Sequence, residues 1–449
     1  MEPSDFWLDL EQRGIVQQTT RPDLGAWLTG RLATKEKFYC YCGFDPTATS
    51  LHVGSLMPVL SLRRLKRAGI TPVVLVGGAT GMIGDPSGKS AERSLLDTET
   101  LAKNVAGMTT QLESLLEGEA GKDFLMVNNA DWFADIRFVD FLRDVGKHFS
   151  VNMMVHRESV RARLEDREHG ISFTEFSYML LQAYDYLHLF RSLGCRLQVG
   201  GSDQWGNIAA GIDLIHHKHH GEEVHGCTFP LITTSSGQKF GKSERGAIWI
   251  DPKRTGPYFF YKYFFHAEDA DVIRFLRYFT FLPLAEIGEL EEKVKTEPHL
   301  RAAQKALARE ITGIVHGPKI AAACEGLEKA MHEDDAAAFE TFAEPLGLLE
   351  FHGETAESDP ANQVVAHRRM EALRGEGVPA VELAVELGLF KSKGEARREI
   401  QSANSGFHVG GRQVTELDFR ITVDLLGGRR VLQLRKGKKN KRMVCFHEV

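Results

Sequence analysis

The sequence predicts an α/β protein in which a doubly wound parallel sheet is followed by an all-α region and a small α+β unit. Strand-like runs alternate with amphipathic helical stretches through the first half, which is typical of a parallel sheet covered on both faces. Beyond residue 250 the pattern turns helical, and near the C-terminus strand-like runs return around Gly-containing turns. We therefore expect folded parts at 1–250, 251–345 and 378–449, with a linker at 346–377.

Length and composition leave room for these parts and favour a reducing compartment. The 449 residues suffice for two or three domains with a large core, and the formal net charge of -6 gives no global signature of nucleic-acid binding. The six cysteines form no CxxC pair, which is typical of thiols kept reduced. No apolar run reaches membrane-spanning length and no signal peptide is recognisable, so we expect a cytoplasmic protein.

The first part is expected to contain five strands bounded by turn residues. They read KFYCYCGF (37–44), TPVVLVGG (71–78), DFLMVNNA (123–130), CRLQVGG (195–201) and TFPLITT (228–234). Between them, MPVLSLRRLKRAG (57–69) and FVDFLRDVGKHF (138–149) have the apolar spacing of amphipathic helices. Ligands of such sheets gather at the carboxyl ends of the strands, so the Gly-rich turns after these runs are the expected binding region.

The stretch FDPTATSLHVGSL (44–56) joins the first of these strands to a helix. Unpaired backbone N–H groups and the helix dipole favour an anion at such a helix N-terminus. His52 and Gly54 are therefore candidates to bind a triphosphate. Taken alone, a loop histidine that caps the helix is an equally good interpretation.

A second loop, SSGQKFGKSERG (235–246), carries Lys239 and Lys242 among three glycines and three serines. Two flexible ammonium groups can close over a pyrophosphate leaving group and neutralise the charge that develops as the bond breaks. By itself this segment is better explained as a solvated turn. Its presence on one chain with HVGS favours the phosphate interpretation of both loops.

Polar side chains recur on an otherwise apolar helix, and a Gly-rich turn follows a strand. Tyr178, Gln182 and Asp185 stand at i, i+4 and i+7 and so share one helix face. A substrate with an ammonium and a hydroxyl group would satisfy this stripe, although pairing within the protein is the commoner arrangement. In QVGGSDQWGN (198–207) a nucleotide can approach the backbone at Gly201, and Asp203 is also a candidate helix N-cap.

Three further patterns carry no predicted site. GDPSGKS (84–90) lacks the first glycine of a P-loop, and HHKHHGEEVHG (216–226) is better explained as a solvated helix end. Cys40-x-Cys42 has no second pair of ligands. We therefore expect no tightly bound metal.

The C-terminal part is strongly basic near its end. Eight basic residues and no acidic one lie between Arg429 and Arg442. Local positive charge of this kind is typical of a surface that binds nucleic-acid phosphates. The apolar alternation of the same segment places these charges on folded strands, which favours RNA binding over a solubilising tail.

Taken together, these motifs resemble the bacterial-type tyrosyl-tRNA synthetases, a family of class I aminoacyl-tRNA synthetases. HVGS is similar to the HIGH signature of that class, and KFGKS is similar to its KMSKS signature. Four longer segments are also similar to sequence motifs of this family, namely YCGFDPTATSLHVG, GGATGMIGDPSG, SFTEFSYMLLQAYD and GGSDQWGNI. The resemblance spans essentially the whole chain. It implies a Rossmann-like catalytic domain at 1–250, a helical anticodon-binding domain at 251–345 and an S-four-type RNA-binding domain at 378–449.

The resemblance implies a tyrosine–tRNA ligase that works in two steps. Tyrosine and ATP, with Mg²⁺ as part of the substrate complex, would give tyrosyl adenylate and pyrophosphate, and tyrosine would then pass to the terminal adenosine of tRNA(Tyr). A homodimer is also implied. Ser55 stands where the family usually has a second histidine, and Phe240 and Gly241 replace Met and Ser of the second signature.

The family's functional residues carry over onto four groups of matching positions. The implied catalytic residues are His52, Ser55, Gln204, Lys239, Lys242 and Ser243. The implied tyrosine-binding residues are Tyr41, Asp85, Tyr178, Gln182 and Asp185. The implied ATP-binding residues are Gly43, Asp45, Thr47, His52, Gly54, Gly201, Asp203 and Lys242. The expected RNA-binding residues are Lys391, Lys393, Arg397, Arg398, Arg435, Lys436, Lys438 and Lys439.

Three alternatives stay open from the sequence. A tryptophanyl-tRNA synthetase shares the architecture and differs in the amino acid that supports ATP–pyrophosphate exchange. A catalytically decayed RNA-binding protein would account for Ser55, but the intact His52 and the two loop lysines argue against it. A small-molecule nucleotidyltransferase would share the first signature and have no use for the basic C-terminal part.

Overall fold

The computed structural model contains two compact units, Met1–Ile250 with Glu268–Thr296, and Asp251–Ala267 with Glu297–Val449. It describes residues 5–448 except 86–96, 158–159, 162–163, 165–169, 236, 238–239, 244–245, 334, 351–364, 403–404 and 438–439, and it leaves the side chains of residues 98, 242 and 243 undescribed. Within this described part, no helix is both long and apolar enough to cross a lipid bilayer.

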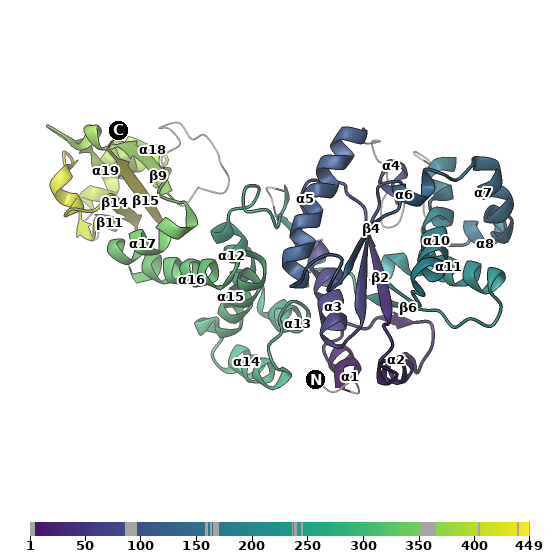
Figure 1. Cartoon of the computed structure of the whole chain (residues 1–449). Helices are drawn as coiled ribbons and strands as arrows, with labels where there is room; N and C mark the ends of the chain where they lie inside the picture. The colour runs from purple at the N-terminus through teal and green to yellow at the C-terminus, as the bar shows by residue number, and fades with distance from the viewer. Residues whose placement is uncertain are drawn as a thin grey trace. The chain divides into compact units, whose positions relative to one another are not determined.

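The first unit is built on a six-stranded sheet of order β1-β6-β5-β2-β3-β4 (Figure 1). Its strands are β1 (Gln18–Thr19), β2 (Tyr39–Phe44), β3 (Thr71–Val76), β4 (Leu125–Asn128), β5 (Leu197–Gly201) and β6 (His225–Phe229). The short β1 pairs antiparallel with β6, and the other neighbours pair in parallel. This confirms the predicted doubly wound α/β class.

One predicted strand was misplaced in the sequence. The structure has the sixth strand at His225–Phe229, whereas the sequence pattern suggests 228–234. Pro230 explains the difference, because proline has no N–H to donate to a strand ladder and ends the strand before it. The two-residue β1 was not predicted, since a strand of that length has no readable periodicity.

Helices cover both faces of this sheet. In Figure 1, α3 (Leu56–Arg67) and α5 (Thr98–Leu116) lie on one side, and α10 (Phe173–Leu193) and α11 (Trp205–Lys218) lie on the other. Tyr41, Val73 and Leu75 point from β2 and β3 into the buried cluster formed with α10 and α11. The other α-helices described in this unit are α1 (Asp5–Gln12), α2 (Leu24–Ala33), α4 (Thr80–Ile83), α6 (Ala130–Phe133), α7 (Phe138–Asp144), α8 (Val151–Val155), α13 (Asp269–Phe279) and α14 (Leu284–Thr296).

Three arginines of α3 hold the end of α13 against α3. The guanidinium groups of Arg63, Arg64 and Arg67 lie 4.7, 4.5 and 4.0 Å from the ring centroid of Phe281, which follows α13. Arg64 also donates to the backbone oxygen of Tyr278 at 3.2 Å. Burial lowers the pKa of Arg64 to about 9. The positive charges of α3 therefore stabilise the packing of α13 against it. Backbone carbonyl oxygens at the end of α13 accept the hydrogen bonds.

The second unit combines helices with a small sheet. Its helices are α12 (Pro257–Phe265), α15 (Ala302–His316), α16 (Pro318–Glu333), α17 (Ala336–Ala343), α18 (Ala380–Glu386) and α19 (Lys393–Gln401). The five-stranded sheet has the order β12-β11-β14-β15-β9, with β9 (Val365–Arg369), β11 (Phe407–Val409), β12 (Arg412–Gln413), β14 (Val431–Lys436) and β15 (Asn440–His447). A further pair joins β10 (Val378–Pro379) to β13 (Arg420–Ile421). Helices followed by an α+β part are thus present, but α13 and α14, which fall in the predicted helical range 251–345, belong to the first unit.

The sheet of this unit begins earlier than the sequence suggests. Strand β9 lies inside the range 346–377 assigned to a linker, and it pairs in parallel with β15. Its sequence, VAHRR, has only two apolar residues, so it gives no strand signal. The stretch FHGETAESDPAN (351–362), which prompted the linker assignment, lies outside the described residues. The functional domain boundaries stay a prediction.

Candidate active site

A cavity of about 430 Å³ opens at the carboxyl ends of the parallel strands in the first unit. It lies where β2 and β5 are neighbours, the point at which the strand order reverses and ligands of open α/β sheets bind. Its lining includes Tyr41, Gly43, Asp45, Thr47, His52, Gly54, Ser55, Asp85, Tyr178, Gln182, Asp185, Gly201, Asp203 and Gln204. All residues of the predicted tyrosine group, and the described residues of the ATP group other than Lys242, therefore meet in one cavity.

Helix α10 supplies three of these side chains. Ser172 caps its N-terminus by accepting a hydrogen bond from the backbone N–H of Glu175, and Gly194 ends it in the left-handed conformation. Tyr178, Gln182 and Asp185 then project from one face of the helix into the cavity. The shared face that their spacing predicts is therefore present in the structure.

Asp185 lies at the buried end of the cavity, with 2% of its surface exposed. Trp132 Nε1 donates to its Oδ1 at 2.9 Å and Asn129 Nδ2 to its Oδ2 at 3.2 Å. Burial raises the pKa of Asp185 to about 8 despite these donors. Two side chains of the protein thus donate hydrogen bonds to this carboxyl group. Pairing within the protein, the alternative to pairing with a substrate, is therefore partly present at Asp185.

The hydroxyl group of Tyr41 lies close to Asp185 and is unsatisfied. Tyr41 is 1% exposed, and its hydroxyl has no hydrogen-bond partner within the described part of the chain. Burial, followed by the Asp185 charge, raises the pKa of this phenol well above its usual value. Because a buried hydroxyl without a partner is costly, the cavity is chemically prepared for a ligand that brings a hydrogen-bonding group to this point.

Amide side chains link the next part of the cavity into a network. Gln182 Nε2 donates to Gln204 Oε1 at 3.2 Å, and Gln204 Nε2 donates to Asp85 Oδ2 at 2.6 Å. Asn207 Nδ2 donates to Gln182 Oε1 at 3.0 Å. These bonds fix the amide oxygens and the carboxylate on one side of the cavity, where acceptors of this kind suit an ammonium group.

A second carboxylate, that of Asp45, connects the predicted tyrosine-binding residues with the predicted ATP-binding residues. The hydroxyl of Tyr178 donates to Asp45 Oδ2 at 3.1 Å, and Thr80 Oγ1 donates to Asp45 Oδ1 at 3.1 Å. Asp45 was assigned to ATP and Tyr178 to tyrosine, so the two predicted subsites touch here. Burial, with the nearby Asp85 charge, also raises the pKa of Asp203.

Sequence reasoning missed several polar residues of the site. Gln198 of β5 is 2% exposed, lines the cavity and has an Oε1 without a hydrogen-bond partner among the described residues. A glutamine inside an otherwise apolar parallel strand was the available signal. Asn129 and Trp132 follow β4 and could only be recognised through their contact with Asp185.

The two signature loops lie against each other. His52 Nδ1 accepts a hydrogen bond from the backbone N–H of Gly54 at 3.0 Å, so the histidine does cap the short 3-10 helix η1 (Val53–Ser55). Gly241 adopts φ +82°, and a Cβ added there would lie 2.6 Å from Val53 Cγ2. Its carbonyl oxygen accepts from Ile248 N–H at 2.9 Å. The second loop therefore continues directly beside η1, and glycine is the residue that permits this approach.

In the sequence, Lys239 precedes the contact made by Gly241, and Lys242 follows it. Lys242 and Ser243 form β7, which pairs with β8 (Gly246–Ala247), although their side chains are not described. Lys239 lies outside the described residues. The backbone thus brings Lys242 one residue from the contact with η1, and the positions of the two ammonium groups stay a prediction.

Phe240 anchors the second loop to α13. It is 8% exposed, and its ring centroid lies 4.9 Å from that of Phe275 and 5.2 Å from that of Phe279. At the start of the loop, Asp271 of α13 accepts a hydrogen bond from the backbone N–H of Ser235 at 2.8 Å. The aromatic residue that departs from the usual signature therefore serves packing rather than chemistry.

We expect Phe240→Ala to loosen this loop, because it removes a buried ring worth about 3 kcal/mol of packing. Hydrogen exchange at the Ile248 amide, which bonds to Gly241, should speed up accordingly. Phe240→Met fills most of the same space and is the matched control. Equal amide protection in the alanine variant and the wild type would contradict the anchoring role.

The pKa of Asp185 gives a testable pH dependence of stability. Its folded pKa of about 8 lies above the ordinary value of 3.8, so the native state binds this proton more tightly than the unfolded state. Stability from the protonated carboxyl is therefore present below pH 4 and is lost between about pH 4 and pH 8. The free energy of unfolding of the wild type should fall relative to Asp185→Asn across that range, by up to about 1.4 kcal/mol per pH unit. Denaturation curves of both proteins with no pH-dependent difference would contradict this assignment.

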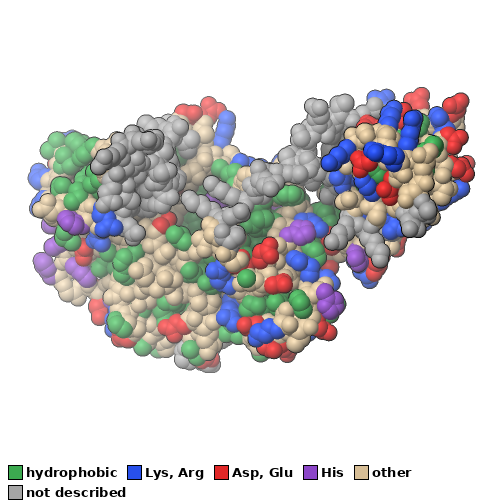
Figure 2. All heavy atoms as spheres, turned by 180° about the vertical axis from the view of Figure 1, so that it is seen from behind, with side chains coloured by type: hydrophobic (Ala, Val, Ile, Leu, Met, Phe, Trp, Pro, Cys, Tyr) green, Lys and Arg blue, Asp and Glu red, His purple; other side chains and the backbone are tan. Residues whose placement is uncertain are grey.

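The basic residues of the C-terminal part are only partly free of acidic neighbours. Lys393, Arg397 and Arg398 are exposed on α19, and Lys391 is exposed two residues before it. Lys393 forms an ion pair with Glu382, and Lys436 Nζ lies 2.6 Å from Glu395 Oε1. Arg435 is half-buried on β14, and Lys438 and Lys439 lie outside the described residues. Figure 2 shows Lys and Arg side chains beside Asp and Glu on the visible face of this part. RNA binding there stays a prediction.

Comparison with known proteins gives one consistent result. A model of the family described as tRNA synthetases class I (W and Y) matches residues 33–332. The tyrosine–tRNA ligase of Opitutus terrae is 49% identical over 438 residues, covering 97% of this chain and 98% of the relative. The tyrosine–tRNA ligase of Bacillus caldotenax is 44% identical over 445 residues, covering 98% of this chain and 100% of the relative.

Solved structures agree on the fold. A C-terminally truncated mitochondrial tyrosyl-tRNA synthetase of Aspergillus nidulans matches with a TM-score of 0.62 and 32% identity, covering 73% of this chain and 94% of that chain. A tryptophanyl-tRNA synthetase of Encephalitozoon cuniculi matches with a TM-score of 0.53 and 16% identity, covering 75% of this chain and 94% of that chain. Backbone similarity is therefore shared by proteins that differ in amino-acid specificity.

Proposed function

This chain belongs to the class I tRNA synthetases of the tryptophan and tyrosine group, and from this premise we propose that it is a tyrosine–tRNA ligase. The observation that carries the proposal is the near full-length similarity to tyrosine–tRNA ligases, at 49% identity in the first case. The buried Tyr41 and Asp185 at the end of the cavity support it, because they offer hydrogen-bonding groups to a substrate hydroxyl.

In the first step, the carboxylate of tyrosine attacks the α-phosphate of ATP in line, and the bond from that phosphorus to pyrophosphate breaks. Tyrosyl adenylate stays bound and pyrophosphate, with its Mg²⁺, leaves. No side chain becomes a covalent nucleophile, so catalysis consists of positioning and charge stabilisation. His52, the N-cap residue of η1, acts on the phosphates, while Lys239 and Lys242 neutralise the charge of the departing pyrophosphate.

In the second step, a ribose hydroxyl of the terminal adenosine of tRNA(Tyr) attacks the carbonyl carbon of the adenylate. The ester forms as AMP leaves. The basic residues around α19 and β14 would hold the tRNA during this transfer, through contacts with its phosphates. A ligase that supplies charged tRNA to translation is expected in the cytoplasm.

Selection of tyrosine follows from the buried end of the cavity. Tyr41 and Asp185 would contact the substrate phenol, and Gln182, Tyr178 and Asp85 its ammonium group. A substrate without the hydroxyl would leave buried polar groups unpaired, at a cost of about 1–3 kcal/mol for each such group. ATP would lie toward Gly43, Asp45, Thr47, Gly54, Gly201 and Asp203, and Gln204 would face the reacting carboxylate.

The test is charging of tRNA(Tyr) with labelled tyrosine by the purified full-length chain. We expect tyrosine to be esterified to the tRNA in an ATP-dependent reaction, with tryptophan and phenylalanine inactive at the same concentration. Charging with tryptophan alone would establish the tryptophanyl alternative. Tight tRNA binding without any charging would establish the decayed RNA-binding alternative.

We further propose that the protein is a homodimer, formed through an exposed apolar patch on α7 and α8. Phe138 and Val139 of α7 are 66% and 71% exposed, and Val151 and Met153 of α8 are 61% and 59% exposed. Figure 2 shows hydrophobic side chains, in green, gathered at the left edge of the view, where α7 and α8 lie. Soluble monomers rarely expose contiguous apolar patches of this kind, and a second copy of the chain would cover them.

We expect Phe138→Asp with Val139→Asp to shift the protein from dimer to monomer in light scattering after size-exclusion chromatography. The added carboxylates would have to be buried in the interface, which disfavours association. Leu8→Asp, at another exposed leucine, is the control and should leave the mass unchanged. A wild-type protein that is monomeric at micromolar concentration would contradict the proposal.

A further inference from the structure

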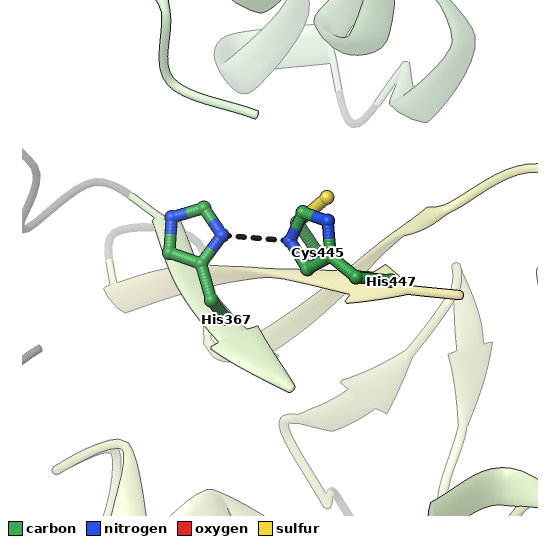
Figure 3. Close-up of side chains that lie close together, drawn as sticks. All are labelled: His367, Cys445 and His447. Atoms are coloured by element: carbon green, nitrogen blue, oxygen red, sulfur yellow. Dashed lines mark hydrogen bonds between the residues drawn. The ribbon is translucent and has the colours of Figure 1, made fainter. Parts of the chain in front are cut away.

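Three side chains with metal-binding atoms lie together on one face of the five-stranded sheet, namely His367, Cys445 and His447 (Figure 3). Strands β9 and β15 pair in parallel with His367 opposite Cys445. Successive side chains of a strand alternate between faces, so Cys445 and His447 point to the same side. One donor atom from each residue lies within 4.8 Å of the other two.

This face is separated from the main core of the domain. Val444 precedes Cys445, and Phe446 lies between Cys445 and His447. Both side chains point into the hydrophobic cluster on the other face of the sheet. His367 and His447 are 6% and 9% exposed, and Cys445 is fully buried. The three donors are therefore held by the sheet and shielded from competing water.

The two imidazole rings already point at each other. His367 Nδ1 and His447 Nε2 are 2.9 Å apart, so one ring donates a proton and the other offers a lone pair at the same place. Zn–N distances of about 2.0–2.1 Å in a tetrahedral site place two nitrogens about 3.3 Å apart. For these two nitrogens, a change of a few tenths of an ångström would let an ion replace the shared proton, and the Cys445 sulfur would then have to close on the ion from within 4.8 Å of both rings.

We propose that His367, Cys445 and His447 bind a thiophilic transition-metal ion, with Zn²⁺ the most suitable, that joins β9 to β15. Two imidazoles and a thiolate are the donors that such ions prefer, and the cluster has no carboxylate to favour Mg²⁺ or Ca²⁺. Three protein ligands leave a fourth position for water. This site was not predicted from the sequence, in which His367 lies far from the other two ligands and inside the predicted linker.

Binding would release one proton and would have to tolerate a nearby arginine. A metal-bound cysteine is a thiolate, so the Cys445 thiol gives up its proton as the metal–sulfur bond forms. The ring that donates the histidine hydrogen bond moves its proton to its other nitrogen. Arg430 disfavours a cation here, but Glu344 lies 3.4 Å from its guanidinium group. Glu340, which accepts from the Arg430 backbone N–H at 2.6 Å, adds a negative charge near Cys445.

The test is titration of the metal-free full-length chain with Co²⁺, which reports a bound thiolate through a charge-transfer band in the near ultraviolet. We expect the band to saturate at about one equivalent, with one proton released per ion, and to be lost on addition of Zn²⁺. The His-rich segment 216–226 contains no cysteine, so adventitious binding there produces no such band.

Variants assign the ligands. Cys445→Ser should abolish the band, and His367→Gln and His447→Gln should each weaken Co²⁺ binding at least tenfold. His408→Gln, on β11 with its ring Nδ1 bonded to the backbone oxygen of Gly406, is the matched control and should leave the titration unchanged. A band that persists in Cys445→Ser, or a wild-type titration without a thiolate band, would overturn the proposal. If a variant fails to fold, X-ray absorption of the zinc-loaded wild type decides, because a shell without sulfur excludes the site.

Discussion

Lys242→Ala is expected to slow the formation of tyrosyl adenylate by about 10²- to 10³-fold while leaving tyrosine affinity nearly unchanged. The reason is positional. Gly241 packs against Val53 of η1, and Lys242 follows it directly in the sequence, so the backbone at Lys242 lies near the loop that carries His52. Its ammonium group would interact with charge that appears mainly as pyrophosphate departs, and such an interaction lowers the barrier without strengthening the binding of tyrosine.

Single-turnover adenylate formation and equilibrium tyrosine binding, measured on the same preparation, separate the two effects. Lys253→Ala removes an exposed lysine beyond the second loop and is the matched control. It should behave as the wild type in both measurements. A parallel loss of tyrosine affinity in Lys242→Ala would show that the lysine supports the structure of the cavity, and the leaving-group role would then be wrong.

Removing residues 351–449 is expected to abolish tRNA charging and to spare adenylate formation. The cavity lies entirely in the first unit, whereas the basic residues assigned to RNA lie on the sheet and helices removed. The cut is placed before β9 because that strand pairs with β15 and would otherwise lose its partner. Charging and pyrophosphate exchange by the truncated protein measure the two activities separately.

A charge-reversal variant tests the same assignment in a folded chain. Lys391→Glu, Arg397→Glu and Arg398→Glu change exposed side chains, so the domain should keep its fold while tRNA affinity falls steeply and the salt dependence of binding weakens. Lys122→Glu, exposed in the first unit, is the control for a charge reversal placed outside this part. Normal charging by either the truncated or the reversed protein would refute RNA binding by this part.

The periodic features of the chain were the ones that the sequence could predict. Apolar runs in alternation with helical stretches predicted the class of the sheet. The i, i+4, i+7 spacing of Tyr178, Gln182 and Asp185 predicted a shared helix face, and in the structure that face lines the cavity. The association of the two signature loops was a hypothesis from motifs alone, and the packing of Gly241 against Val53 gives it a physical basis.

The features that sequence reasoning missed depend on contacts between distant segments. Trp132 and Asn129 become relevant only because β4 ends beside Asp185, and neither residue type signals that position. Phe240 was noted as a departure from the signature, but its role emerges only from the packing of α13. The cluster of His367 with Cys445 requires a parallel pairing between residues far apart in the chain, which no local pattern encodes.

The most direct test of the central claim is ATP–pyrophosphate exchange by the purified chain, with tyrosine, tryptophan and phenylalanine supplied in turn. If the buried end of the cavity recognises a phenol beside paired phosphate-binding loops, exchange will require tyrosine and will be strongly reduced in Asp185→Ala. Exchange that is equally rapid with phenylalanine, or absent with all three amino acids, would contradict this account.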